Sequence, residues 1–164
     1  KGLDLAGTYR LRTEGFGTFG FSLSGTYLTD FGVAITSTAA PADRLNTIFN
    51  PLKLKLRGAV NWNLDLWRAS LVVNRVHGYQ NNAVTPVESV GPYTPVDVTL
   101  NRDLTDLGGA LAEGMDVGIE FRNAFDESPP YVNLAPSVNG SGGYDASTTN
   151  PVGRMFAISL RKKW

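Results

Sequence analysis

Cysteine is absent from this chain of 164 residues, and histidine occurs once, as His77. The absence of cysteine excludes disulfide bonds and thiolate metal sites. A single histidine excludes a metal site built from several imidazoles, and a Ser-His-Asp triad would have to use His77 itself. Lysine plus arginine and aspartate plus glutamate both number 15, so no excess of positive charge favours nucleic acid as a partner. The composition therefore points away from an enzyme, a cofactor, a bound metal and nucleic acid.

Long hydrophobic runs are also missing. No apolar stretch approaches the roughly 20 residues that a transmembrane helix needs. Any contact with a bilayer would therefore have to be made by β-strands. The chain begins at Lys1 without methionine or a signal peptide, so it is either a mature protein or a fragment of a longer one. We expect a fragment that forms a single domain over residues 1–164.

The dominant pattern in the chain is two-residue alternation. Its 18 glycines and 9 prolines divide it into stretches of about ten residues, in which apolar residues recur at every second position. In the most regular stretch the apolar set is Leu52, Leu54, Leu56, Val60 and Trp62, and the polar set is Lys53, Lys55, Arg57, Asn61 and Asn63. The strands predicted in this way span residues 2–12, 18–27, 52–63, 67–74, 96–101, 115–122 and 156–163. We therefore predict an all-β fold of about seven antiparallel, up-and-down strands.

Alternation alone fits both a soluble β-sandwich and a membrane β-barrel. The lengths of the connections distinguish the two architectures. Two connections are short (residues 13–17 and 63–66), one is intermediate (residues 103–114), and three are long (residues 29–51, 77–94 and 123–153). Short turns on one rim and long loops on the other are typical of outer-membrane barrels. This layout places the long loops outside the cell and Trp62, Trp67 and Trp164 at the periplasmic rim, as an aromatic belt. We therefore predict part of a transmembrane β-barrel, either a partial barrel or an open curved sheet.

The polar set of the third strand predicts a basic ladder on the inner side of the barrel. Lys53, Lys55 and Arg57 would line a wet interior, which is where charged residues of such barrels lie. We predict contact of these three side chains with an anionic ligand or with a domain that plugs the barrel. The alternative is that they are only solvated.

Four motifs resemble one family. The stretch from Asn150 to Trp164 opens with a Gly-Arg pair and ends its alternating strand on an aromatic residue, and it resembles the closing strand of TonB-dependent receptors. Residues 123–133, with the sequence NAFDESPPYVN, are similar to the motif that follows the family's penultimate strand, although Ala124 stands where leucine is usual. Residues 93–97 and Asn61-Trp62 also occur where the family has similar residues. The resemblance covers most of the chain from about residue 50 onwards.

The resemblance implies a receptor of the bacterial outer membrane that takes up an iron–siderophore complex, a vitamin or a carbohydrate. In the full-length protein the barrel would be plugged by an N-terminal domain and energised through TonB, and neither a plug nor a TonB-contacting segment is found here. The fragment alone is therefore not expected to transport. The family's terminal strand is read by the barrel-assembly machinery, so Phe156, Ile158, Leu160 and Trp164 are candidates for that signal, with contact to outer-membrane lipid as the plain alternative.

Two other architectures stay open at this point. A soluble extracellular β-sandwich acting as a binding module would bury the apolar faces of its strands against each other. A small complete outer-membrane barrel would need an even number of strands. That reading requires an eighth strand around residues 33–35.

Overall fold

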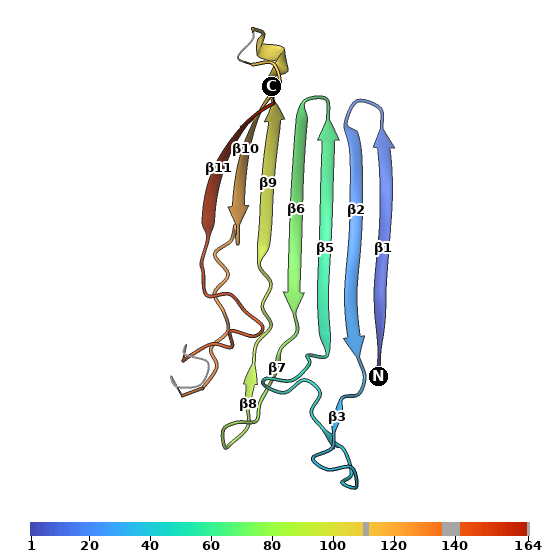
Figure 1. Ribbon diagram of the computed structural model, residues 1–164, viewed down its shortest axis with the longest axis vertical. Helices are drawn as coiled ribbons and strands as arrows, with labels where there is room; N and C mark the ends of the chain where they lie inside the picture. The colour runs from blue at the N-terminus through green and yellow to red at the C-terminus, as the bar shows by residue number, and fades with distance from the viewer. Residues whose placement is uncertain (110–111, 136–141, 164) are drawn as a thin grey trace.

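The computed structural model describes residues 1–109, 112–135 and 142–163, and its long elements are all β-strands. Seven of them form one antiparallel sheet, in the order in which they follow each other along the chain (Figure 1). They are β1 (Gly2–Thr13), β2 (Gly17–Leu28), β5 (Leu54–Leu64), β6 (Trp67–Val76), β9 (Val96–Asp103), β10 (Met115–Arg122) and β11 (Met155–Lys162). The predicted all-β, up-and-down architecture of seven strands is confirmed. The sheet is open, because among the described strands β1 and β11 each pair on one side only.

The register of the sheet keeps apolar residues in common rows. Tyr9 pairs with Phe21, Phe21 with Val60, and Val60 with Leu71. Because side chains alternate between the two faces of a strand, this register places most of the large apolar residues of the seven strands on one face. We call this the apolar face and the opposite side the polar face.

The short connections lie at one end of the sheet and the long ones at the other, as predicted. Figure 1 shows the two tight turns at the end where the chain finishes, and the long loops at the end where it starts. In the first turn Gly17 has φ +81°, and a Cβ built on it would lie 2.2 Å from the Asn63 carbonyl oxygen, so only glycine fits. In the second turn Asp65 has φ 48°, a left-handed conformation that aspartate tolerates. We call these two ends the short-turn end and the long-loop end.

The remaining elements are short. Two small hairpins lie in the long loops, β3 (Gly32–Val33) with β4 (Ala42–Asp43) and β7 (Tyr79–Asn81) with β8 (Glu88–Val90). A 3-10 turn, η1 (Thr105–Leu107), follows β9. The eighth strand that a small complete barrel would require around residues 33–35 is not part of the main sheet. β3 ends at Val33 and pairs only with β4, and Ile35 is 89% exposed, so this segment buries too little apolar surface to extend as a strand.

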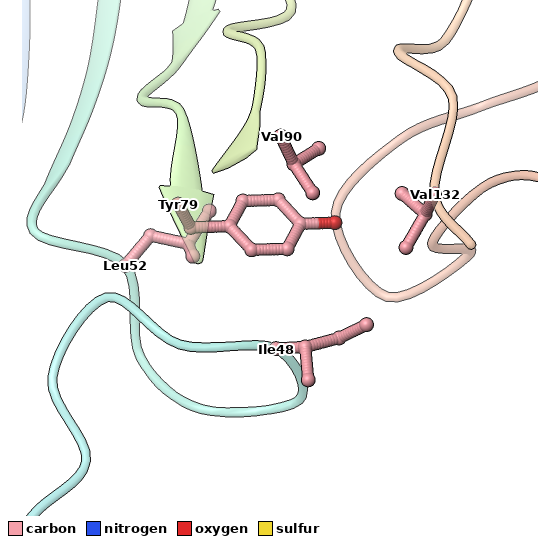
Figure 2. Packing of buried hydrophobic residues seen from close by; sticks show 5 residues of the cluster. All are labelled: Ile48, Leu52, Tyr79, Val90 and Val132. Atoms are coloured by element: carbon pink, nitrogen blue, oxygen red, sulfur yellow. The ribbon is translucent and has the colours of Figure 1, made fainter. Parts of the chain in front are cut away.

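The buried core lies among the long loops and not on the sheet. It consists of Ile48, Leu52, Tyr79, Val90 and Val132, which meet around the ring of Tyr79 (Figure 2). We call this cluster the loop core. Its members come from three loops that are far apart in the sequence, so it joins these loops into one unit.

Leu52 was predicted to lie within a strand, and that prediction is wrong. β5 begins at Leu54, and Leu52 is 3% exposed in the loop core. Two hydrogen bonds hold the preceding segment in a loop: Asn46 N–H donates to the Pro51 carbonyl at 2.9 Å, and Lys53 N–H donates to Asn46 Oδ1 at 3.0 Å. The apolar side chain at position 52 therefore continues the two-residue pattern by coincidence and packs with the loops.

No described helix is long and apolar enough to cross a membrane.

Candidate functional site

The apolar face is not covered by a second layer in the part of the chain that the structure describes. Large hydrophobic side chains on it are exposed on six of the seven long strands, from Leu3 at 71% on β1 to Ile158 and Leu160 at 67% on β11, and those of β5 are half-buried between their neighbours. Scattered exposed hydrophobic residues are ordinary, but a contiguous patch of this extent marks an interaction surface. Neither small hairpin belongs to a second layer stacked over the strands, since each is a two-stranded sheet within a loop. The apolar faces therefore do not bury each other as in a β-sandwich.

Aromatic side chains support one another along this face. The rings of Tyr9 and Phe21 stack with centroids 6.3 Å apart, and those of Phe19 and Phe21 lie 6.4 Å apart. At the other edge of the sheet, Phe121 and Phe156 lie 5.1 Å apart. The Tyr9–Phe21 and Phe121–Phe156 pairs join neighbouring strands and stabilise them without a second layer.

Two of the three tryptophans predicted to form a belt lie at the short-turn end of the apolar face. Trp62 occupies β5, and its indole Nε1–H donates to the carbonyl oxygen of Phe16 in the neighbouring turn at 2.7 Å. Trp67 begins β6 and is 37% exposed. Trp164 lies outside the described residues. An indole with one polar edge held in a turn and its ring on an apolar face has the amphipathic placement of an interfacial residue.

Cations border the apolar face at both ends. At the short-turn end the Arg102 guanidinium lies 5.1 Å from the ring centroid of Trp67 and forms an ion pair of 2.6 Å with Asp106. At the long-loop end Arg75, which pairs with Leu56, donates to Thr94 Oγ1 at 3.1 Å. The alternation of β6 extends to Arg75, two residues after Val73, so the sequence carried this signal although no prediction used it.

The predicted basic ladder is divided by the structure. Lys55 and Arg57 are exposed on the polar face, where Arg57 Nη1 donates to Asn74 Oδ1 at 2.6 Å. Lys53 precedes β5, and its Nζ lies 5.7 Å from the ring centroid of Tyr27, a residue of the apolar face. The reason is the loop around Asn46 described above, which keeps residue 53 out of the strand.

Elsewhere on the polar face, the described residues form two ion pairs. Arg68 of β6 forms an ion pair with Asp116 of β10, across the intervening strand β9. Arg122 contacts Glu120 at 2.6 Å within β10. These exposed pairs contribute little stability, and they keep the face strongly hydrated.

The motif residues at the long-loop end meet in one hydrogen-bond network. Asn123 has φ 49° and is 5% exposed. Its Nδ2 donates to the Glu127 carbonyl at 2.9 Å, its Oδ1 accepts from Glu127 N–H at 2.8 Å, and its own N–H donates to Asp97 Oδ1 at 2.9 Å. Asn123 thus closes the turn after β10 and ties that turn to β9.

Asp126 connects the same turn to the last strand. Its Oδ1 accepts from Arg154 N–H at 2.8 Å, and a Cβ added to Gly153 would lie 2.7 Å from this oxygen. A side chain at position 153 would therefore displace the carboxylate that accepts from Arg154 N–H. We call Asp97, Asn123, Asp126, Gly153 and Arg154 the strand clasp. The sequence motifs contained all five residues, but their contact with one another was not predicted.

The loop core is anchored by a buried carboxylate. Asp145 is 1% exposed; its Oδ2 accepts from the Tyr79 hydroxyl at 3.1 Å, and its Oδ1 accepts from the N–H and the Oγ–H of Ser147 at 2.9 and 2.6 Å. Burial, followed by the negative charge of Asp145, raises the pKa of Tyr79 well above its ordinary range. The phenol therefore stays protonated and holds two long loops together.

The candidate assembly signal lies on β11. Phe156, Ile158 and Leu160 share the apolar face and are 56%, 67% and 67% exposed. Trp164, the fourth candidate, lies outside the described residues. β11 pairs with β10 alone among the described strands, so its outer backbone edge is available to another strand.

Among the residues that the structure describes, no three His, Cys, Asp or Glu side chains gather where they could hold a metal ion.

No family model matches the chain, and no curated protein or solved structure matches it. The likeness to TonB-dependent receptors is therefore carried by the motif residues alone.

Proposed function

We propose that this chain is part of the wall of a bacterial outer-membrane β-barrel of the TonB-dependent receptor type. In this proposal the apolar face contacts lipid and the polar face lines the interior. The observation that carries it is a single-layer meander whose entire apolar face is uncovered and bordered by cations at both ends. In water such a face would be an aggregation site, whereas in a bilayer it is the expected outer surface of a barrel.

The distance between the bordering cations suits a bilayer. Arg102 pairs with Trp67, and Arg75 lies eight positions further along β6. At about 3.3 Å per residue this is roughly 26 Å along the strand, and a tilt of about 40° reduces it to roughly 20 Å across the membrane. Arginine side chains extend outward by several ångström, so their charged groups can reach the borders of an apolar band of about 25 Å.

The direction of the edge strands supports a place within a larger barrel. Six successive antiparallel pairings make β1 and β11 run in the same direction. Closing an antiparallel barrel around this sheet therefore needs an odd number of further strands, which gives the even total found in bacterial barrels. The plugged transporters of this class have about 22 strands.

Uptake of an iron–siderophore complex, a vitamin or a carbohydrate with energy from TonB is proposed for the whole receptor. It rests on the four motifs, three of which contribute residues to the strand clasp. Contact of Lys55 and Arg57 with the plug or an anionic ligand is proposed on the same basis. So is recognition of Phe156, Ile158, Leu160 and Trp164 by the barrel-assembly machinery.

Neighbouring positions on the two faces of β6 test the lipid contact. The chain has no cysteine, so Leu71→Cys and Ser70→Cys each introduce one thiol, on the apolar and the polar face respectively. In lipid vesicles a water-soluble maleimide should label the variant at position 70 and spare the one at position 71. Both thiols should react once the lipid is replaced by urea. Equal labelling of the two positions in vesicles would contradict the proposal.

A further inference from the structure

The apolar face has a hollow over β1, β2, β5 and β6. A depression of about 510 Å³ lies where β1 and β5 carry glycine on either side of Leu23. A Cβ built on Gly7 or on Gly58 would meet no atom within 4 Å, so the hollow is open above both positions. The side chains around it are Tyr9, Phe21, Leu23, Val60, Leu71 and Val73. The hollow is thus apolar on all sides.

Two cations lie toward the long-loop border of this hollow. Val73 of its wall pairs with Gly58, and Arg75 follows two residues later on the same face, paired with Leu56. Lys53 lies just before β5, over the ring of Tyr27. Among the described residues neither Arg75 nor Lys53 forms an ion pair, whereas Arg102 at the opposite border is paired with Asp106. The long-loop border therefore holds two positive charges that form no ion pair within the described part of the chain.

We propose that the hollow and these two cations bind one phosphate-bearing lipid, with an acyl chain over Gly58 and Gly7 and the phosphate at Arg75 and Lys53. A guanidinium and an ammonium are the groups that bind phosphate oxygens best, and they bind them more strongly beside an apolar surface than in water. A chain lying in the hollow fills space that no side chain fills. This inference rests on the proposed function, because the face must first be in contact with lipid.

The two halves of the proposed ligand can be tested separately. The full chain in a non-ionic detergent is titrated with phosphatidylglycerol, with diacylglycerol, which lacks the phosphate, and with glycerol 3-phosphate, which lacks the chains. Native mass spectrometry counts the bound molecules. We expect one phosphatidylglycerol per chain and much weaker binding of the other two.

Variants identify the site. Arg75→Gln should weaken phosphatidylglycerol binding about tenfold, as expected for the loss of a charge-assisted contact. Gly58→Leu should weaken it to a similar extent by filling the hollow, and Gly7→Leu serves as a second filling variant. Arg10→Gln makes the same change of charge on the polar face of β1 and should leave binding unchanged. Circular dichroism checks that each variant keeps its β content.

The opposing results are distinct. Equal binding of diacylglycerol would overturn phosphate recognition, and full retention of phosphatidylglycerol by both filling variants would overturn the acyl-chain site. Glycerol 3-phosphate binding as tightly as the lipid would indicate a site for a free anion. A chain that takes up no detergent would instead contradict the proposed function itself.

Discussion

Asn123→Ala tests whether the strand clasp holds the last strands of the sheet. The asparagine side chain makes two hydrogen bonds to the backbone of Glu127, one to its carbonyl at 2.9 Å and one from its N–H at 2.8 Å. It also holds φ at 49° in a position that is 5% exposed. Alanine removes both hydrogen bonds and is unfavourable in this left-handed conformation.

The expected loss can be worked out from these contacts. Leaving a buried polar group without a partner costs about 1–3 kcal/mol, and the Glu127 groups are only partly buried, so the lower end applies to each. The left-handed conformation adds about 1 kcal/mol for alanine. We therefore expect Asn123→Ala to lower the free energy of unfolding by about 2–4 kcal/mol. Asn123→Gly should lose about 1 kcal/mol less, because glycine carries no conformational penalty at this φ. Asn123→Asp keeps the acceptor for Glu127 N–H and should lose about 1 kcal/mol.

Urea unfolding of the chain in detergent, followed by tryptophan fluorescence, gives these free energies. Amide hydrogen exchange locates the effect. The substitution should increase the exchange rate most in β10 and β11 and leave it unchanged in β1 and β2. Equal destabilisation by alanine and glycine would refute the conformational part of the reasoning. Uniformly faster exchange across all seven strands would refute the local clasp.

Two further predictions concern the loop core and the first turn. The pKa of Tyr79 is raised by burial and by Asp145, so its stabilisation is complete below about pH 10 and is lost as the pH rises toward the folded-state value. The free energy of unfolding should therefore decrease as the pH is raised above about 10. Tyr79→Phe should remove most of this decrease and leave the smaller contribution of Tyr93, whose pKa is also raised by burial. An unchanged dependence of the unfolding free energy on pH would show that other groups titrate. Gly17→Ala should cost more than about 2 kcal/mol because of its positive φ and its approach to the Asn63 carbonyl, whereas Gly7→Ala, with open space above it, should cost less than about 1 kcal/mol. Thermal unfolding of both glycine variants in detergent would expose any reversal of this order.

The strands and their faces could be predicted because alternation is a local signal. Each strand needs only its own residues to show which side is apolar, and the antiparallel register then brings like sides together. The prediction failed at Leu52 and at Lys53, where the alternation of apolar and polar residues continues but the backbone is not part of the strand. There a contact from Asn46, seven residues before Lys53, decides the conformation. Such contacts have no period in the sequence.

The clasp and the loop core were beyond reach for a similar reason. Asp126 and Arg154 are separated by 28 positions, and Tyr79 and Asp145 by 66. Composition identifies these segments as loops, but it does not indicate which loops contact each other in the fold. The bordering cations were within reach, because Arg75 continues the alternation of β6 past Val73.

The location of the loop core has a consequence for the order of assembly. Most domains bury apolar side chains between their strands and have loosely packed loops. In this chain the loops pack around a buried core, whereas one face of the strands is exposed. The cap formed by the loops brings its own interior and its own hydrogen bonds, so it can become ordered in water. In the proposed barrel, by contrast, the apolar face of the strands would exchange water for lipid. The stability of the loop core therefore depends on water, and that of the sheet depends on what contacts its apolar face. A change of detergent should destabilise the sheet long before it affects the loop core.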